Sequence, residues 1–133
     1  MDNTITASTM GIAMSGMRAQ TSSMKVIANN IANTMTSRTT AGVPYQRQVM
    51  VTETGRGLAG VEATRVVRDT SAFKDVYMPG HPDADAAGYV KMPNVDLPVE
   101  MMSLVTASRV YQANAAVMRR HIEGLDQTLE LLK

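Results

Sequence analysis

The last third of the 133-residue chain carries a regular stripe of apolar side chains. Its positions are separated by alternating steps of four and three residues, the spacing of a helix face that packs against another helix. The stripe contains Leu97, Met101, Leu104, Tyr111, Ala115, Met118, Ile122, Leu125, Leu129 and Leu132, with Ser108 as its polar member. Asp96 is a suitable N-cap and Pro98 fits the first turn. The pattern predicts a helix over residues 97–133, roughly 54 Å long.

Residues 1–35 repeat this pattern, with Thr21 as the weak position. The stripe contains Ala7, Met10, Met14, Met17, Met24, Ala28, Ile31 and Met35. The charged residues of this segment are Asp2, Arg18 and Lys25, and the rest is rich in Ser, Thr, Asn and Gly, which are weak helix formers. A helix of this composition is marginal alone in water and fits a position enclosed by neighbours. We predict a helix of roughly 45 Å that pairs with the first one, and we assign the apolar stripes of both helices to subunit packing.

The pattern changes to that of strands and turns between the two helices. Three segments have strand character, namely residues 45–51, 61–68 and 74–77. A flexible turn is predicted at residues 55–60, and Pro79, Gly80, His81 and Pro82 predict an irregular structural turn. The expected fold is therefore mainly α with a small β insertion.

The order of these elements predicts how the chain is divided. Because the insertion joins the end of one helix to the start of the other, the helices can fold back antiparallel. Residues 1–35 and 97–133 then form one discontinuous coiled-coil domain, and residues 36–96 form a β-rich insertion with ordered loops. Ala28 and Ala115 are the stripe positions at which we expect the closest helix approach, because their side chains are small.

Composition supports a protein that uses extended contact surfaces. The chain has one Phe, four Tyr, no Trp and twelve Met, so methionine supplies much of the apolar volume. The net charge of +1 favours neither a nucleic-acid partner nor an anionic membrane. The absence of cysteine excludes disulfides and cysteine zinc sites. No run is long enough to span a bilayer, and the first residues lack the features of a cleaved secretory signal.

Four groups of residues are candidates for chemical sites. Gly55, Gly57 and Gly60 match a dinucleotide-binding spacing, but the strand-like segment after them favours a hairpin loop. Asp and His in turns more often bond to backbone than to metal, so His81, Asp83 and Asp85 favour a turn over a cation site.

The other two groups have a packing or surface interpretation. Thioether sulfur binds Cu(I), yet Met10, Met14 and Met17 at helical spacing favour packing. The cluster Arg119, Arg120 and His121 is balanced by nearby acidic residues and favours a solvated or intersubunit ion-paired face. No catalytic constellation remains, so we expect no enzyme activity, no cofactor and no small-molecule substrate.

Several sequence motifs resemble those of bacterial flagellar axial proteins, which form the rod, hook and filament junction. The N-terminal signature is carried by residues 15–20 (SGMRAQ) and 28–33 (ANNIAN), followed by Thr36, Arg38 and Thr39. Residues 77–85 (YMPGHPDAD), 88–95 (GYVKMPNV) and 107–114 (ASRVYQAN) narrow the resemblance to basal-body proteins of the proximal rod. The resemblance covers essentially the whole chain.

The resemblance implies a structural subunit whose terminal helices form the inner tube around the export channel. It implies copies of itself, other rod proteins, the membrane ring and the flagellar type III export apparatus as partners. It also implies assembly in the periplasm after export without a cleaved signal. The alternatives are another axial rod or hook protein, or a generic helical-hairpin adaptor.

Three asparagines lie where the first helix is expected to end and the insertion to begin. Asn29, Asn30 and Asn33 mark this helix-insertion junction. We expect Asn30 and Asn33 to cap the helix or to cross-link the junction by hydrogen bonds. The alternative is that they are exposed polar residues without a specific role.

Overall fold

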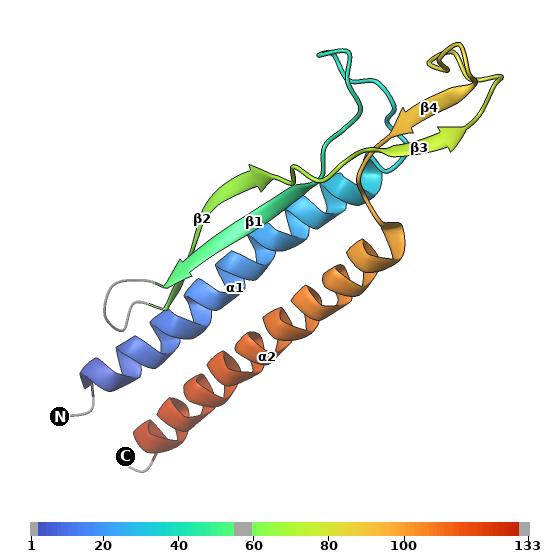
Figure 1. Cartoon of the computed structure of the whole chain (residues 1–133). Helices are drawn as coiled ribbons and strands as arrows, with labels where there is room; N and C mark the ends of the chain where they lie inside the picture. Colours follow the sequence, from blue (N-terminus) through green and yellow to red (C-terminus); the bar gives the residue numbers. More distant parts are fainter. Residues whose placement is uncertain (1–2, 55–59, 131–133) are drawn as a thin grey trace.

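The computed structural model describes residues 3–54 and 60–130, and it consists of two long helices with two small hairpins between them. Helix α1 (Asn3–Ala32) and helix α2 (Leu97–Glu130) lie side by side and run antiparallel (Figure 1). The start of α1 and the end of α2 therefore lie at the same end of the molecule. This confirms the mainly α fold with a small β region. The coiled-coil geometry and the division into domains stay predictions.

The ends of the helices that meet the insertion are capped by polar side chains. The Asp96 carboxylate accepts a hydrogen bond from the backbone N–H of Val99 (3.3 Å) at the start of α2. At the end of α1, the Asn33 amide donates to the Asn29 carbonyl (2.9 Å) and accepts from the Thr36 hydroxyl (3.1 Å). Helix α1 ends at Ala32, and residues 33–35 form a turn rather than the last helical turn that was predicted.

The first hairpin lies along α1. Strand β1 (Gln48–Thr54) pairs antiparallel with β2 (Val61–Arg68), with a bulge after Val51 (Figure 1). The Ser15 hydroxyl on α1 accepts a hydrogen bond from the N–H of Val61 (3.0 Å). Gly60 has φ +80°, and a side chain there would overlap the Ser15 hydroxyl, so only glycine allows this close contact. The predicted glycine turn falls mostly on residues 55–59, outside the described residues.

The second hairpin lies beyond the end of α1, past the junction with the insertion. Strand β3 (Lys74–Tyr77) pairs antiparallel with β4 (Tyr89–Met92) (Figure 1). Strands β2 and β3 have the predicted bounds, whereas β1 begins three residues later than predicted. Strand β4 was missed, although its residues alternate between exposed and buried.

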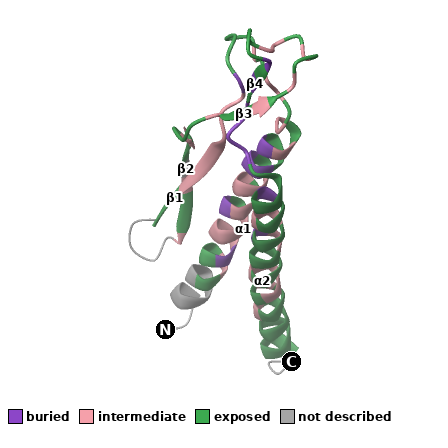
Figure 2. Cartoon of the chain, turned by 45° about the vertical axis from the view of Figure 1, so that its right-hand side comes forward, coloured by how far each residue is buried: buried purple, intermediate pink, exposed green. Residues whose placement is uncertain are grey.

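The buried core is thin and follows the contacts among α1, α2 and the hairpins (Figure 2). The described residues with buried apolar side chains are Ala13, Ala19, Val26, Ile27, Val90, Met92, Val95 and Ala107. At 100° per residue, the buried face of α1 is centred roughly a third of a turn away from its methionine stripe. The apolar stripe of α1 therefore lies beside this core, and its assignment to subunit packing stays a prediction. Small side chains fill the buried face, because α2 and the first hairpin both approach α1 there.

One close contact between the helices is made by a glycine. A side chain at Gly16 would place its Cβ 2.7 Å from the Asn114 amide nitrogen of α2. Ala28, in contrast, is exposed and Ala115 is half-buried. Within the chain, Ala28 is therefore not a point of close helix approach, contrary to the prediction. The small residue that this contact requires is Gly16, which lies on a different face of α1 from Ala28.

Candidate assembly site: a polar junction and two uncovered helix faces

A buried polar cluster joins both helices to the insertion, and we call Asn30, Arg47, Asn94 and Glu100 the polar junction. Asn30 and Glu100 are each 1% exposed. The Asn30 amide donates to the Gln48 carbonyl (2.8 Å) and to the Glu100 carboxylate (3.0 Å). Its oxygen accepts from the Gln48 N–H (2.9 Å) and from the Tyr45 hydroxyl (3.0 Å). Every hydrogen-bonding position of this amide is used.

Arg47 supplies the positive charge of the polar junction. Its Nε donates to Glu100 Oε1 (2.6 Å), and its Nη1 donates to Asp69 Oδ2 (3.3 Å). Burial lowers the pKa of Arg47, but the hydrogen bonds and the charges of Glu100 and Asp69 outweigh it and hold the pKa above its usual value. Burial, and then the Glu100 charge, raise the pKa of Tyr45. The cluster therefore carries a fixed positive charge against a buried carboxylate.

Asn94 connects the polar junction to the segment that follows β2. The side-chain oxygen of Asn94 accepts a hydrogen bond from the backbone N–H of Arg47 (2.7 Å). Its side-chain NH₂ donates to the Asp69 carbonyl (3.1 Å) and to the Ser71 hydroxyl (2.8 Å). Hydrogen bonds from Ser71, and then Arg47, lower the pKa of Asp69. One cluster thus fixes the end of α1, the start of β1, the end of β2 and the start of α2.

The sequence indicates Asn30 as a hydrogen-bonding residue of the helix-insertion junction, but it does not indicate Glu100. A glutamate in the first turn of a helix commonly complements the helix dipole from the surface. Glu100 does lie in the first turn, but its carboxylate is buried and paired with Arg47. In the sequence, only the apolar neighbours Val99, Met101 and Met102 indicate that Glu100 could be buried. Arg47 and Asn94 carried no such signal.

Helix α1 presents its methionine stripe outside the core. Met10, Met14, Met17, Met24 and Ile31 are half-buried, and Ala28 and Met35 are exposed. The side chains of the first turns, Ala7 included, lie outside the described set. A shallow groove of about 360 Å³ runs from Met14, Met17 and Thr21 to Tyr111 on α2.

Helix α2 has more exposed apolar side chains than α1. Of its stripe, Leu104, Ala115 and Met118 are half-buried and Leu132 lies outside the described residues; the exposed members are Leu97, Met101, Tyr111, Ile122, Leu125 and Leu129. Outside the stripe, Val99, Met102, Val105, Val110 and Val117 are also exposed. Contiguous apolar surface of this kind marks an interaction site in soluble proteins. No described helix is long and apolar enough to cross a membrane.

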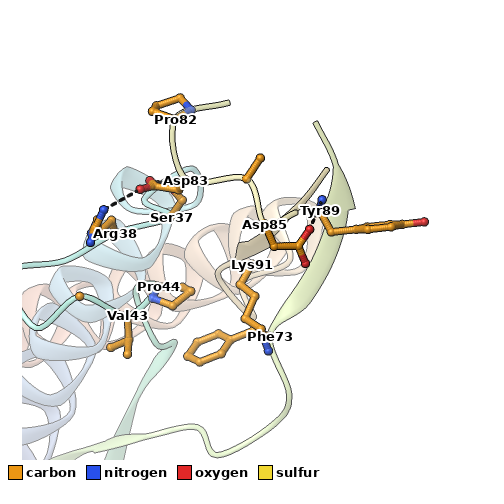
Figure 3. A pocket seen from close by; sticks show the side chains of 12 residues that line it. Ser37, Arg38, Val43, Pro44, Phe73, Pro82, Asp83, Asp85, Tyr89 and Lys91 are labelled. Atoms are coloured by element: carbon orange, nitrogen blue, oxygen red, sulfur yellow. Dashed lines mark hydrogen bonds and ion pairs between the residues drawn. The ribbon is translucent and has the colours of Figure 1, made fainter. Parts of the chain in front are cut away.

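The loop from Pro79 to Gly88 is tied to the segment after α1 and lines a cleft of about 630 Å³ (Figure 3). The Asp83 carboxylate accepts from the Ser37 hydroxyl (2.8 Å) and from Arg38 (3.2 Å), and both contacts lower the pKa of Asp83, Ser37 more strongly. His81 Nδ1 accepts from the Asp83 N–H (3.1 Å), and Asp85 accepts from two backbone N–H groups. Within residues 3–54 and 60–130, no three His, Asp or Glu side chains are grouped to hold a metal.

Gly88 is the glycine of this loop whose backbone conformation excludes other residues. Gly80 has open space where a Cβ would lie, and Pro82 is exposed. Gly88 has φ +83°, and a Cβ there would lie 2.8 Å from the ring of Tyr77. Pro79, Gly80, His81 and Pro82 do lie in the predicted turn, in which the His81 N–H donates to the Met78 carbonyl (3.0 Å), and Gly80 lies in it without a positive φ.

Replacing Gly88 with valine is expected to lower the free energy of unfolding by about 2–4 kcal/mol. A β-branched residue at positive φ is strained, and its side chain would also displace Tyr77. Gly80→Val is the matched control and should change stability by less than about 1 kcal/mol. Urea unfolding of both variants measures the difference, and equal losses would contradict this account of the loop.

Comparison with known proteins identifies similar sequences along nearly the whole chain. A family model described as "Flagella basal body rod protein" matches residues 10–38, and "Flagellar basal body rod FlgEFG protein C-terminal" matches residues 86–131. The chain is 38% identical to the flagellar basal-body rod protein FlgC of Borreliella burgdorferi, over 95% of this chain and 97% of that protein. It is 40% identical to FlgC of Salmonella typhimurium, over 90% of this chain and 92% of that protein. It is 36% identical to FlgC of Agrobacterium fabrum, over 92% of this chain and 91% of that protein.

Proposed function

Because this chain belongs to the FlgC family of flagellar basal-body rod proteins and is a structural subunit of the rod, we propose that its two helices build the tube of that rod. In this proposal the uncovered faces of α1 and α2 pack against copies of the chain and against other rod proteins. The tube encloses the export channel and transmits rotation. Family membership decides against the generic adaptor and the other axial proteins.

The observation that carries the proposal is the apolar surface left uncovered on both helices. The half-buried methionine stripe of α1 and the exposed apolar residues of α2 leave apolar side chains unsuited to permanent contact with water. Residues 1–35, which contain α1, carry only three charged side chains, and such a helix fits an environment of neighbouring subunits better than solvent. Neighbours in a polymer would cover both faces at once.

The polar junction has a matching role in this proposal. It fixes the insertion against the ends of both helices, so that each subunit presents its apolar faces in one geometry. Buried polar contacts favour one arrangement over others because mispaired alternatives leave charges unsatisfied. We therefore assign subunit packing to the helix faces and shape to the junction.

The remaining partners and the location extend the proposal. We propose that the subunit is exported by the flagellar type III apparatus without a cleaved signal and assembles in the periplasm on the membrane ring. We also propose that it has no enzymatic activity. Its role requires no cofactor and no small-molecule substrate.

A deletion and complementation experiment tests this function. Cells without the gene should not swim, and a plasmid copy should restore swimming together with the presence of the chain in isolated basal bodies. Normal swimming of the deletion strain, or basal bodies that lack the chain after complementation, would contradict the proposed function.

A further inference from the structure

The reactive sulfur of this chain lies in its methionines. The sequence contains twelve Met and no Cys, so thioethers are the side chains most readily oxidised by two electrons. The exposed fraction of these methionines differs widely. Met102 is 73% exposed and Met101 is 55% exposed, whereas Met92 is 6% exposed. The stripe methionines of α1 from Met10 to Met24 are half-buried, whereas Met35 after the helix is 71% exposed. The Met14 sulfur also accepts a hydrogen bond from Arg18 (3.4 Å).

The two exposed neighbours Met101 and Met102 lie on a surface that the proposed function assigns to assembly. They line a shallow groove of about 340 Å³ on α2 together with Val105, Thr106 and Arg109. The groove begins directly after Glu100, where the polar junction fixes the start of α2. A change of polarity at this position would therefore act on a surface whose geometry is set by the fold.

We propose that Met101 and Met102 form an oxidation site that controls whether the free subunit can assemble. The oxidant class is a hypohalous acid such as hypochlorous acid. The thioether sulfur loses two electrons and gains one oxygen, while the chlorine is reduced to chloride and one proton is released. The product, methionine sulfoxide, is polar, and methionine sulfoxide reductases return it to the thioether.

The physical reason for the effect is desolvation. A sulfoxide oxygen accepts strong hydrogen bonds from water, and those bonds are lost when a neighbouring subunit covers the groove. Oxidation should leave the fold of the chain intact, because both side chains are more than half exposed. In the assembled rod the same residues would be covered and protected. The inference rests on the proposed function, because that function supplies the neighbouring subunit.

The first experiment measures site selectivity on the purified full-length chain. Limited hypochlorous acid is added, and peptide mass spectrometry follows the oxidation of each methionine with time. Met101 and Met102 are expected to be oxidised at least about tenfold faster than Met92, which the fold buries. Equal rates at the pair and at Met92 would overturn the proposal.

The second experiment measures the consequence for assembly. A strain whose own copy is replaced carries either Met101→Gln with Met102→Gln, which is permanently polar, or Met101→Leu with Met102→Leu, which cannot be oxidised. The Gln pair should fold normally by circular dichroism but lower the amount of chain in basal bodies by about tenfold or more. The Leu pair should assemble and swim normally, and it should keep assembling at a hypochlorous acid dose that stops the wild type.

These results distinguish a failure of the oxidation site from a failure of the proposed function. Normal assembly of the Gln pair, or equal sensitivity of wild type and Leu pair, would overturn the oxidation site alone. Absence of the unmodified chain and of the Leu pair from basal bodies would instead overturn the proposed function. Recovery of assembly after treatment of the oxidised chain with both epimer-specific methionine sulfoxide reductases is the expected final result.

Discussion

Replacing Glu100 with alanine is expected to lower the free energy of unfolding by about 3 kcal/mol, a large share of the stability of a chain this size. The substitution removes the buried carboxylate that accepts from Arg47 Nε and from the Asn30 amide. Arg47 then keeps its charge without its closest partner, and one Asn30 donor is left without an acceptor. The value lies at the low end for buried ion pairs because Arg47 keeps partial contact with water.

Two control variants separate this effect from a general change in helix α2. Glu123→Ala removes an exposed carboxylate from the same helix and should change stability by less than about 0.5 kcal/mol. Glu100→Gln keeps the size and an acceptor for Asn30, and it should lose less than the alanine variant. Denaturant unfolding measures all three. A Glu100→Ala midpoint equal to that of Glu123→Ala would show that the polar junction does not hold the helices and the insertion together.

Replacing Ala28 with glutamate is expected to abolish swimming while leaving the isolated subunit folded. Ala28 is exposed within the chain, so the change should alter the free energy of unfolding by less than about 0.5 kcal/mol. Between subunits the same carboxylate would be buried without a partner, at a cost of several kcal/mol per contact. The variant chain should be exported but should be missing from basal bodies.

The matched control for this experiment is Ala28→Ser, which keeps the side chain small and uncharged. It should swim on soft agar nearly as well as the wild type. Ala115→Glu is a weaker test, because Ala115 is half-buried and its substitution also disturbs the fold. If Ala28→Glu cells swim and their basal bodies contain the variant, the assignment of the α1 stripe to subunit packing is wrong.

The elements that could be predicted from sequence are those with a long or clear pattern. The heptad stripe located α2 to within a few residues, and β-branched runs located β2 and β3 with their observed bounds. Strand β4 was missed because it has four residues, so its alternation is too short to be distinguished from a loop. Its partner in the sheet lies across the loop that contains His81.

The buried face of α1 and the polar junction depend on contacts that periodicity does not show. The apolar stripe of α1 marks the face assigned to subunit packing, whereas the hairpin and α2 cover the side that carries Gly16 and Ala19. Small residues pack closely without forming a hydrophobic pattern. Arg47 and Glu100 lie 53 positions apart, and only the folded chain brings their charges together. Apolar side chains that remain outside the fold are therefore the ones that we assign to neighbouring subunits.

A cryo-electron microscopy map of isolated basal bodies that contain this chain tests the central claim most directly. The account predicts that the α1 stripe from Met10 to Ala28 and the exposed α2 residues near Met101 contact neighbouring subunits, while the polar junction keeps its contacts within each subunit. A map in which these two helix faces border solvent or the open channel, with the subunits joined through the hairpins alone, would contradict it.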